Sequence, residues 1–132
     1  MSAENVEIVR LGYDEFLATG ELVERITAPE FVWDMSTFHG WPERQTYEGP
    51  EGTREFLTEW LGAWEDWRLE VRELIDAGDD VVAILHQSGR SKTTGLEVDM
   101  DFAQVWTIKD GKQTRMRMYG DTDEALRAVG LS

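Results

Sequence analysis

The segment from Leu96 to Ile108 constrains the fold more than any other part of the chain. Every second residue is apolar or aromatic, with Gln104 as the one polar member of that set. An alternation with a period of two predicts a β-strand that buries one face. Gln104 would therefore place an amide among apolar side chains, where it needs a hydrogen-bond partner or a ligand.

Helical and strand patterns divide the rest of the chain. Asp110-Gly111 predicts a hairpin turn after this strand, and Asp121 predicts the N-cap of a last helix. Residues 36–50 and 88–95 are expected as loops. We expect helices over residues 6–20, 22–26, 56–64 and 122–130, and strands over residues 31–35, 67–72, 81–87, 96–108 and 115–119.

Segregation of these helices from a run of antiparallel strands indicates the α+β class, in the order α-α-β-α-β-β-β-β-α. A curved antiparallel sheet covered by helices forms a cone, whose wide end is a natural ligand cavity. The chain contains six Trp, five Phe and three Tyr, and we expect some of these rings to line that cavity.

Composition excludes several classes of protein. The chain has 132 residues, which predicts one domain over residues 1–132. Its 27 acidic and 13 basic side chains give a formal net charge of −14, which disfavours nucleic acid and anionic membranes as partners. Without cysteine it forms no disulfide or thiolate metal site, and its two histidines lack metal-ligand spacing. The first residues have no apolar run typical of a signal peptide, so we expect a cytoplasmic location.

Short segments of the chain resemble a known family. They are Tyr13 seven residues before Gly20, Ala28-Pro29-Glu30, residues 47–52 with the sequence YEGPEG, and Asp110-Gly111-Lys112. With the element order, they make the chain similar to the SnoaL-like branch of the nuclear transport factor 2-like superfamily, which is related to ketosteroid isomerases. The resemblance implies a cone fold over nearly the whole chain. It does not imply one activity, because this fold hosts isomerases, cyclases, epoxide hydrolases, dehydratases and non-enzymes.

The ketosteroid isomerase pattern can be placed on this sequence residue by residue. Its substrate-binding tyrosine falls on Tyr13, its general-base aspartate on Met35 with Asp34 beside it, and its neutral aspartic acid on Gln104. The oxygen-binding donor is thus kept, whereas the base is replaced by a thioether. We therefore expect no steroid isomerase activity by that mechanism. The carboxylates of the limonene epoxide hydrolase pattern are also absent, at residues 85–88 and 117–119.

His86 is the candidate acid or base. Alternation places it on one face with Val82 and Ile84, and the resemblance makes that the cavity face; the alternative is a histidine held in the core by one hydrogen bond. The predicted catalytic residues are His86, Tyr13 and Gln104. The predicted substrate-binding residues are Trp33, Met35, Trp60, Phe102, Trp106 and Met118. Asp34, His39 and Asp121 are further candidates for the site. The alternative to a functional role is an outward-facing side chain for Asp34, an exposed loop position for His39 and a helix cap for Asp121.

The same alternation places Ala83, Leu85, Ala103 and Val105 together on the outer face of the sheet. An apolar strip of that size favours a homodimer through this face. The favoured function is a cofactor-free and metal-free acid–base enzyme, of isomerase, cyclase or dehydratase type, acting on an apolar cyclic small molecule. The alternatives are a cone that binds hydrophobic ligands without catalysis, and a dimeric interaction domain.

Overall fold

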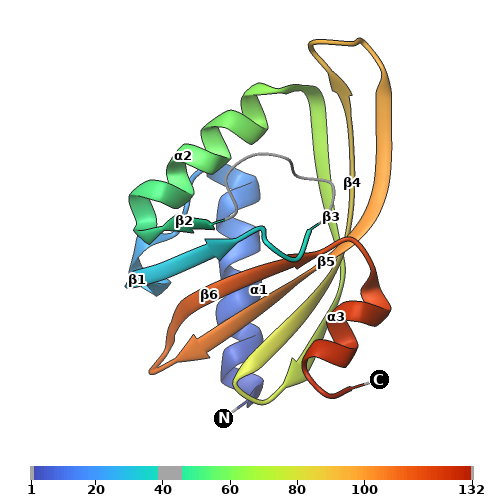
Figure 1. Cartoon of the computed structure of the whole chain (residues 1–132). Coiled ribbons are helices and arrows are strands. Elements are labelled where there is room, and N and C mark those ends of the chain that lie inside the picture. Colours follow the sequence, from blue (N-terminus) through green and yellow to red (C-terminus); the bar gives the residue numbers. More distant parts are fainter. Residues whose placement is uncertain (1, 39–45, 132) are drawn as a thin grey trace.

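The computed structural model describes residues 2–38 and 46–131 (Figure 1). It contains helices, strands and a short 3-10 helix that together form one curved sheet with its covering helices. The elements are α1 (Ser2–Thr19), η1 (Glu24–Ile26), β1 (Thr27–Asp34), β2 (Thr46–Glu48), α2 (Gly49–Gly62), β3 (Trp64–Ala77), β4 (Asp80–Ser91), β5 (Glu97–Lys109), β6 (Lys112–Tyr119) and α3 (Thr122–Ala128).

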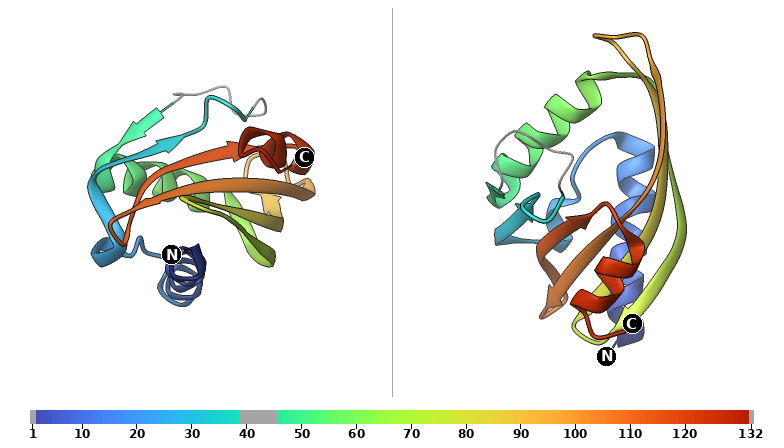
Figure 2. Two further views of the ribbon diagram at one scale, coloured as in Figure 1. Left: turned by 90° about the horizontal axis from the view of Figure 1, so that it is seen from below. Right: turned by 45° about the vertical axis from the view of Figure 1, so that its right-hand side comes forward.

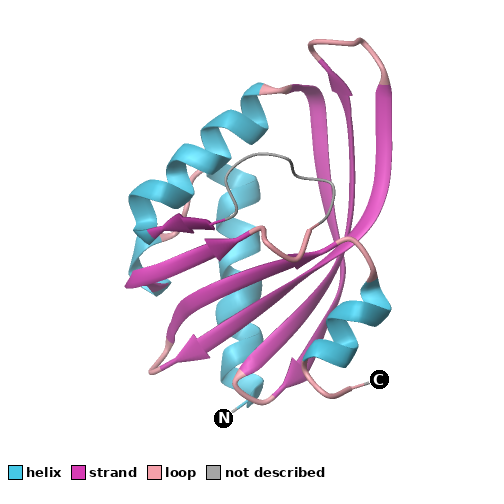
Figure 3. Ribbon diagram, viewed as in Figure 1, coloured by secondary structure: helices cyan, strands magenta, loops and turns pink. Residues whose placement is uncertain are grey.

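The six strands form a single sheet in the order β2-β1-β6-β5-β4-β3. β1 and β6 are parallel, and every other neighbouring pair is antiparallel. Helices and strands occupy separate layers, which confirms the α+β class (Figure 3). Seen from below, α1 and α3 lie on opposite sides of the sheet (Figure 2). We call the face toward α1 and α2 the inner face and the face toward α3 the outer face.

Local signals in the sequence explain how several elements end. Asp110 and Gly111 both have positive φ, at 52° and 78°, which the type I′ turn of a two-residue hairpin requires. Gly20, with φ of 76°, ends α1 and donates its N–H to the Phe16 carbonyl. The Asp121 carboxylate accepts from the Asp123 N–H and caps α3. These three predictions are confirmed.

Several boundaries differ from the sequence prediction. α1 begins at Ser2, α2 begins at Gly49, and β3 spans Trp64–Ala77, so Trp64 belongs to a strand and not to the preceding helix. Residues 24–26 form a single 3-10 turn, and β1 begins at Thr27, so Pro29 lies within a strand instead of ending a helix. The expected loop 36–50 contains β2, which is short and pairs only with β1. β4 continues to Ser91 because it pairs with β3 as far as Trp64. Cross-strand pairing, which local sequence does not reveal, decides the presence of β2 and the end of β4.

The faces of β4 are the largest correction. Ala83 pairs with Gln104 and Leu85 pairs with Phe102, and paired residues point to the same side of a sheet. Ala83 and Leu85 therefore belong to the inner face, within the core cluster that contains Phe102 and Trp106. The placement of Ala83 and Leu85 outside, and of His86 inside, was wrong. Val82, Ile84 and His86 lie on the outer face.

The outer face has its own small core. Ala103 and Val105 do lie there, as predicted, but they pack with Val82 and with Ala125 of α3, and all four are fully buried. The apolar strip that suggested a homodimer is therefore covered by the chain's own last helix. Among the described residues, no helix combines the length and apolar character needed to span a membrane.

Candidate functional site

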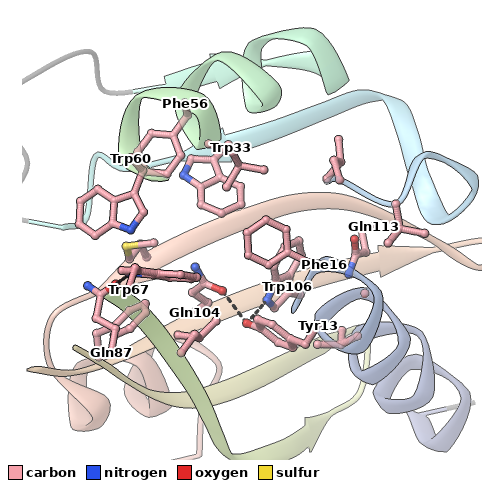
Figure 4. Close-up of a pocket in the computed structure, with 18 residues that line it drawn as sticks. Tyr13, Phe16, Trp33, Phe56, Trp60, Trp67, Gln87, Gln104, Trp106 and Gln113 are labelled. Atoms are coloured by element: carbon pink, nitrogen blue, oxygen red, sulfur yellow. Dashed lines mark hydrogen bonds between the residues drawn. The ribbon is translucent and has the colours of Figure 1, made fainter. Parts of the chain in front are cut away.

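A cavity lies between α1, α2 and the inner face of the sheet (Figure 4). Its volume is about 80 Å³, counted as space open to the centres of water molecules, which is room for several waters. Five of the six predicted substrate-binding residues line it: Trp33, Trp60, Phe102, Trp106 and Met118. Met35 does not line it. This residue is fully buried beside the cavity wall, and its sulfur accepts a 3.2 Å hydrogen bond from the Trp33 indole.

Aromatic rings hold one another in place around the cavity. The Trp33 ring lies 5.0 Å from Phe56, and Phe56 stacks on Trp60 at 5.9 Å between ring centroids. Trp106 meets Trp33 edge to face at 6.1 Å and Tyr13 at 5.9 Å. Such contacts fix large apolar surfaces in one arrangement, so the wall facing the cavity is preformed.

A chain of hydrogen bonds crosses this wall from α1 to β5. The Trp106 indole N–H donates to the Tyr13 hydroxyl at 2.8 Å, and the Tyr13 O–H donates to the Gln104 side-chain oxygen at 2.5 Å (Figure 4). The structure therefore brings together two of the three predicted catalytic residues. Gln104 is 5% exposed, and no described group accepts from its amide NH₂. The chain thus ends in a hydrogen-bond donor that lines the cavity.

Tyr13 stays neutral at physiological pH. Burial raises the pKa of its hydroxyl far above the ordinary value, and the hydrogen bond from Trp106 lowers it by a smaller amount. Tyr13 can therefore donate a hydrogen bond but does not act as a base. Among the described residues that line the cavity it is also the only one with an ionisable side chain. The described cavity is apolar with neutral polar groups.

His86 lies on the other side of the sheet. Its Nδ1 is 2.6 Å from Asp101 and its Nε2 is 2.6 Å from Asp99, and Arg72 binds Asp101 from β3. The hydrogen bond from His86 is the main cause that lowers the pKa of Asp101. His86 therefore takes part in a surface charge network and does not contact the cavity.

The remaining candidates are also placed by the structure. Asp34 points away from the cavity, where it is 3% exposed and bound by Ser36 and Arg115. Burial alone would raise the pKa of Asp34, but these hydrogen bonds and the Arg115 charge outweigh it and lower the pKa overall. Asp121 caps α3. His39 lies outside the described residues. No cluster of three potential metal ligands is present in the part of the chain that the structure describes.

Sequence reasoning missed two buried glutamines of the cavity, Gln87 and Gln113. They are 5% and 3% exposed, and both line the cavity with Gln104. Gln87 was not singled out; it shares the parity of Leu85, a residue that was placed on the wrong face. Gln113 follows the hairpin turn directly, where alternation had not yet been established. For Gln87 the available signal was an amide at the parity of Ala83 and Leu85, as for Gln104, whereas Gln113 lies between Lys112 and Thr114 and carries no such signal.

A family model described as a SnoaL-like domain matches residues 15–116, most of the chain. The chain belongs to the SnoaL-like domain family. This confirms the resemblance inferred from the sequence. No curated protein matches this SnoaL-like chain.

Solved structures share the fold of this SnoaL-like protein over nearly its whole length. An NTF2-like protein from Burkholderia thailandensis E264 has a TM-score of 0.78 at 25% identity, covering 93% of this chain and 95% of its own. TerC, co-crystallised with polyporic acid, has a TM-score of 0.70 at 26% identity, covering 96% and 98%. An NTF2-like protein from Burkholderia pseudomallei K96243 has a TM-score of 0.75 at 21% identity, covering 96% and 98%.

Proposed function

We propose that this SnoaL-like protein binds an apolar ring compound in its cavity, and that Gln104 donates a hydrogen bond to an oxygen of that compound. The observation that carries the proposal is the free amide NH₂ of Gln104 in a wall of aromatic rings. Tyr13 uses its only proton to hold Gln104, so the donor offered to a ligand is the amide. The complex of TerC with polyporic acid supports a small-molecule ligand.

Ligand binding is favoured over proton transfer as the activity of the described site. An isomerase, cyclase or dehydratase of the acid–base type needs a group that takes a proton from the substrate. The predicted base, His86, lies on the outer face, and the described cavity residues include no carboxylate or imidazole. The binding alternative considered from the sequence is therefore the one that the geometry supports best.

The proposal is tested by calorimetric titration with 1-tetralone and tetralin. These two compounds share one ring frame and differ in one carbonyl oxygen. Tetralin should bind, and 1-tetralone should bind about two- to tenfold more tightly, as expected for one additional hydrogen bond. Gln104→Leu should remove most of this preference and leave tetralin within about twofold. Absence of saturable binding by both compounds would overturn the proposal.

His86→Ala is the matched control, because it changes a polar residue of the same sheet on the face away from the cavity. Its affinities for 1-tetralone and tetralin should equal those of the wild type. A loss of binding equal to that of Gln104→Leu would show that the outer face contributes to the ligand site.

Two expectations from the sequence stay predictions. One is the cytoplasmic location. The other is the homodimer, whose motivating apolar residues are buried within the chain. Light scattering at micromolar concentration tests it, since a dimer would give about twice the chain mass of 15.2 kDa.

A further inference from the structure

Gln87 is a second buried amide of the cavity, separate from the Trp106–Tyr13–Gln104 chain. It lies on the inner face of β4, opposite Met100 of β5. Gln104 lies four residues further along β5, which is roughly 13 Å along the strand. The two glutamines therefore mark different levels of the same cavity, with Leu85 and Phe102 between them.

The orientation of the Gln87 amide follows from its partner. The Trp67 indole nitrogen lies 3.0 Å from the Gln87 side-chain oxygen. An indole N–H only donates, so the amide atom that faces it has to be the oxygen. The NH₂ group then points elsewhere, and no described group accepts from it. Because Gln87 is 95% buried (5% exposed) and lines the cavity, these two donors are available to a bound molecule.

The backbone holds Trp67 in this position. The register of β3 against β4 shifts between Glu65 and Arg68, and Asp66 has a positive φ of 54°. A β-bulge of this kind re-aims the side chain beside it. Gly89 of β4 permits the close approach, because a Cβ there would lie 3.4 Å from the Trp67 Cα and 3.3 Å from the Trp64 ring. Trp67 also packs edge to face on Phe16 at 6.3 Å.

We propose that the Trp67–Gln87 pair is a second donor site of the cavity, which selects ligands carrying an acceptor oxygen, such as a carbonyl, at that level. The proposal rests on the proposed function, since it concerns the same cavity. Gln87 contacts the ligand, and Trp67 is a positioning residue that keeps the amide oxygen occupied.

The two hydrogen-bond chains of the cavity share one polarity. Each begins at an indole N–H, and each ends in an amide NH₂. A ligand that offers acceptors satisfies both ends, whereas a ligand that offers N–H or O–H groups leaves buried donors facing donors. Unpaired buried donors are unfavourable, so the Gln104 and Gln87 ends of the cavity discriminate against such ligands.

The test compares 1,4-naphthoquinone, naphthalene and 1-naphthylamine, which share one planar frame and offer two acceptors, none, and an N–H donor. The absence of cysteine removes the most reactive nucleophile toward the quinone. The wild type should bind the quinone most tightly. Gln87→Leu should weaken quinone binding about fivefold or more and leave naphthalene within about twofold. Met100→Leu, on the facing strand, is the matched control and should behave as the wild type.

Trp67→Phe tests the positioning role, because it removes the indole N–H and keeps an aromatic ring. The freed amide can turn its oxygen to the cavity, so the preference for the quinone over 1-naphthylamine should fall, with both affinities normalised to naphthalene. Gln87→Met replaces Gln87→Leu if the latter does not fold. Equal effects of the Gln87 variants on quinone and naphthalene would overturn this inference and leave the 1-tetralone result at Gln104 standing. Failure of the wild type to bind any of these ring compounds would overturn both proposals.

Discussion

The two faces of β4 and β5 carry different kinds of polar groups. On the inner face, Gln87 and Gln104 are neutral amides, each held through its oxygen by a single donor. On the outer face, His86 of β4 binds the carboxylates of Asp99 and Asp101 of β5. Arg72 of β3 also binds Asp101. These charged groups are partly or largely exposed, with the Asp99 side chain 72% and that of Asp101 63% exposed.

This difference follows from the solvent that each face meets. Water screens and solvates charges on the outer face, so ion pairs form there without a large desolvation penalty. In the apolar cavity a charge would lack that compensation, and neutral amides supply directed hydrogen bonds without carrying a charge. The inner face is therefore suited to recognise a neutral ligand, whereas the charged groups around His86 on the outer face stay in contact with water.

A large effect should come from truncating side chains on the inner face, compared with their neighbours on the outer face. Leu85 is fully buried on the inner face, whereas Ile84 is half-buried on the outer one. Leu85→Ala should lower the free energy of unfolding by about 2–4 kcal/mol, and Ile84→Ala by about half as much. Urea denaturation of both variants measures this. Equal losses would mean that the two faces are packed alike.

The assignment of Leu85 also changes what a polar substitution would do. An outer-face position of Leu85 at a dimer interface would imply that Leu85→Glu produces a monomer. In the structure this residue faces Phe102 across β4 and β5 inside the core. An unpaired carboxylate there should prevent folding. The circular dichroism spectrum of Leu85→Glu should therefore show a loss of secondary structure, and not the spectrum of a folded monomer.

An intermediate effect is expected at Asp34, the buried carboxylate of the outer face. Asp34→Ala leaves the Ser36 donors without their partner and should lower the free energy of unfolding by about 1–3 kcal/mol at pH 7. The pKa of Asp34 is lowered in the folded state, so its contribution is present above the unfolded value of about 3.9 and is lost as pH falls through the folded pKa. The difference between wild type and variant should therefore shrink below about pH 4. A difference that grew toward acid pH would contradict the assigned ion pair.

The smallest effect is expected at His86. Its partners are exposed carboxylates, and exposed ion pairs contribute little. His86→Ala should lower the melting temperature by less than half the shift seen for Asp34→Ala, and 1 M salt should reduce the difference further because it screens the pair. Thermal denaturation at low and high salt measures this. A large, salt-independent loss would place His86 in the core, the alternative that the sequence left open.

Much of this protein was determined by its sequence. The alternation over residues 96–108 identified β5 and its inner face, including Gln104, because a residue pattern with a period of two needs no partner to be recognised. The Asp110-Gly111 turn and the Asp121 cap are set by the backbone angles and hydrogen bonds of a few adjacent residues. Family membership followed from such local features and their order.

Only the tertiary structure decided which face of β4 meets the cavity. Alternation separates Leu85 and Gln87 from His86, but it does not say which set points inward, since both sets contain apolar residues. That choice depends on the register with β5, where Ala83 lies opposite Gln104, and on α3, which covers Val82 and Val105 from the other side. The bulge that turns Trp67 toward Gln87 is likewise a property of paired strands. Parity is a local property of one strand, whereas the direction of the cavity is defined by the elements packed around it.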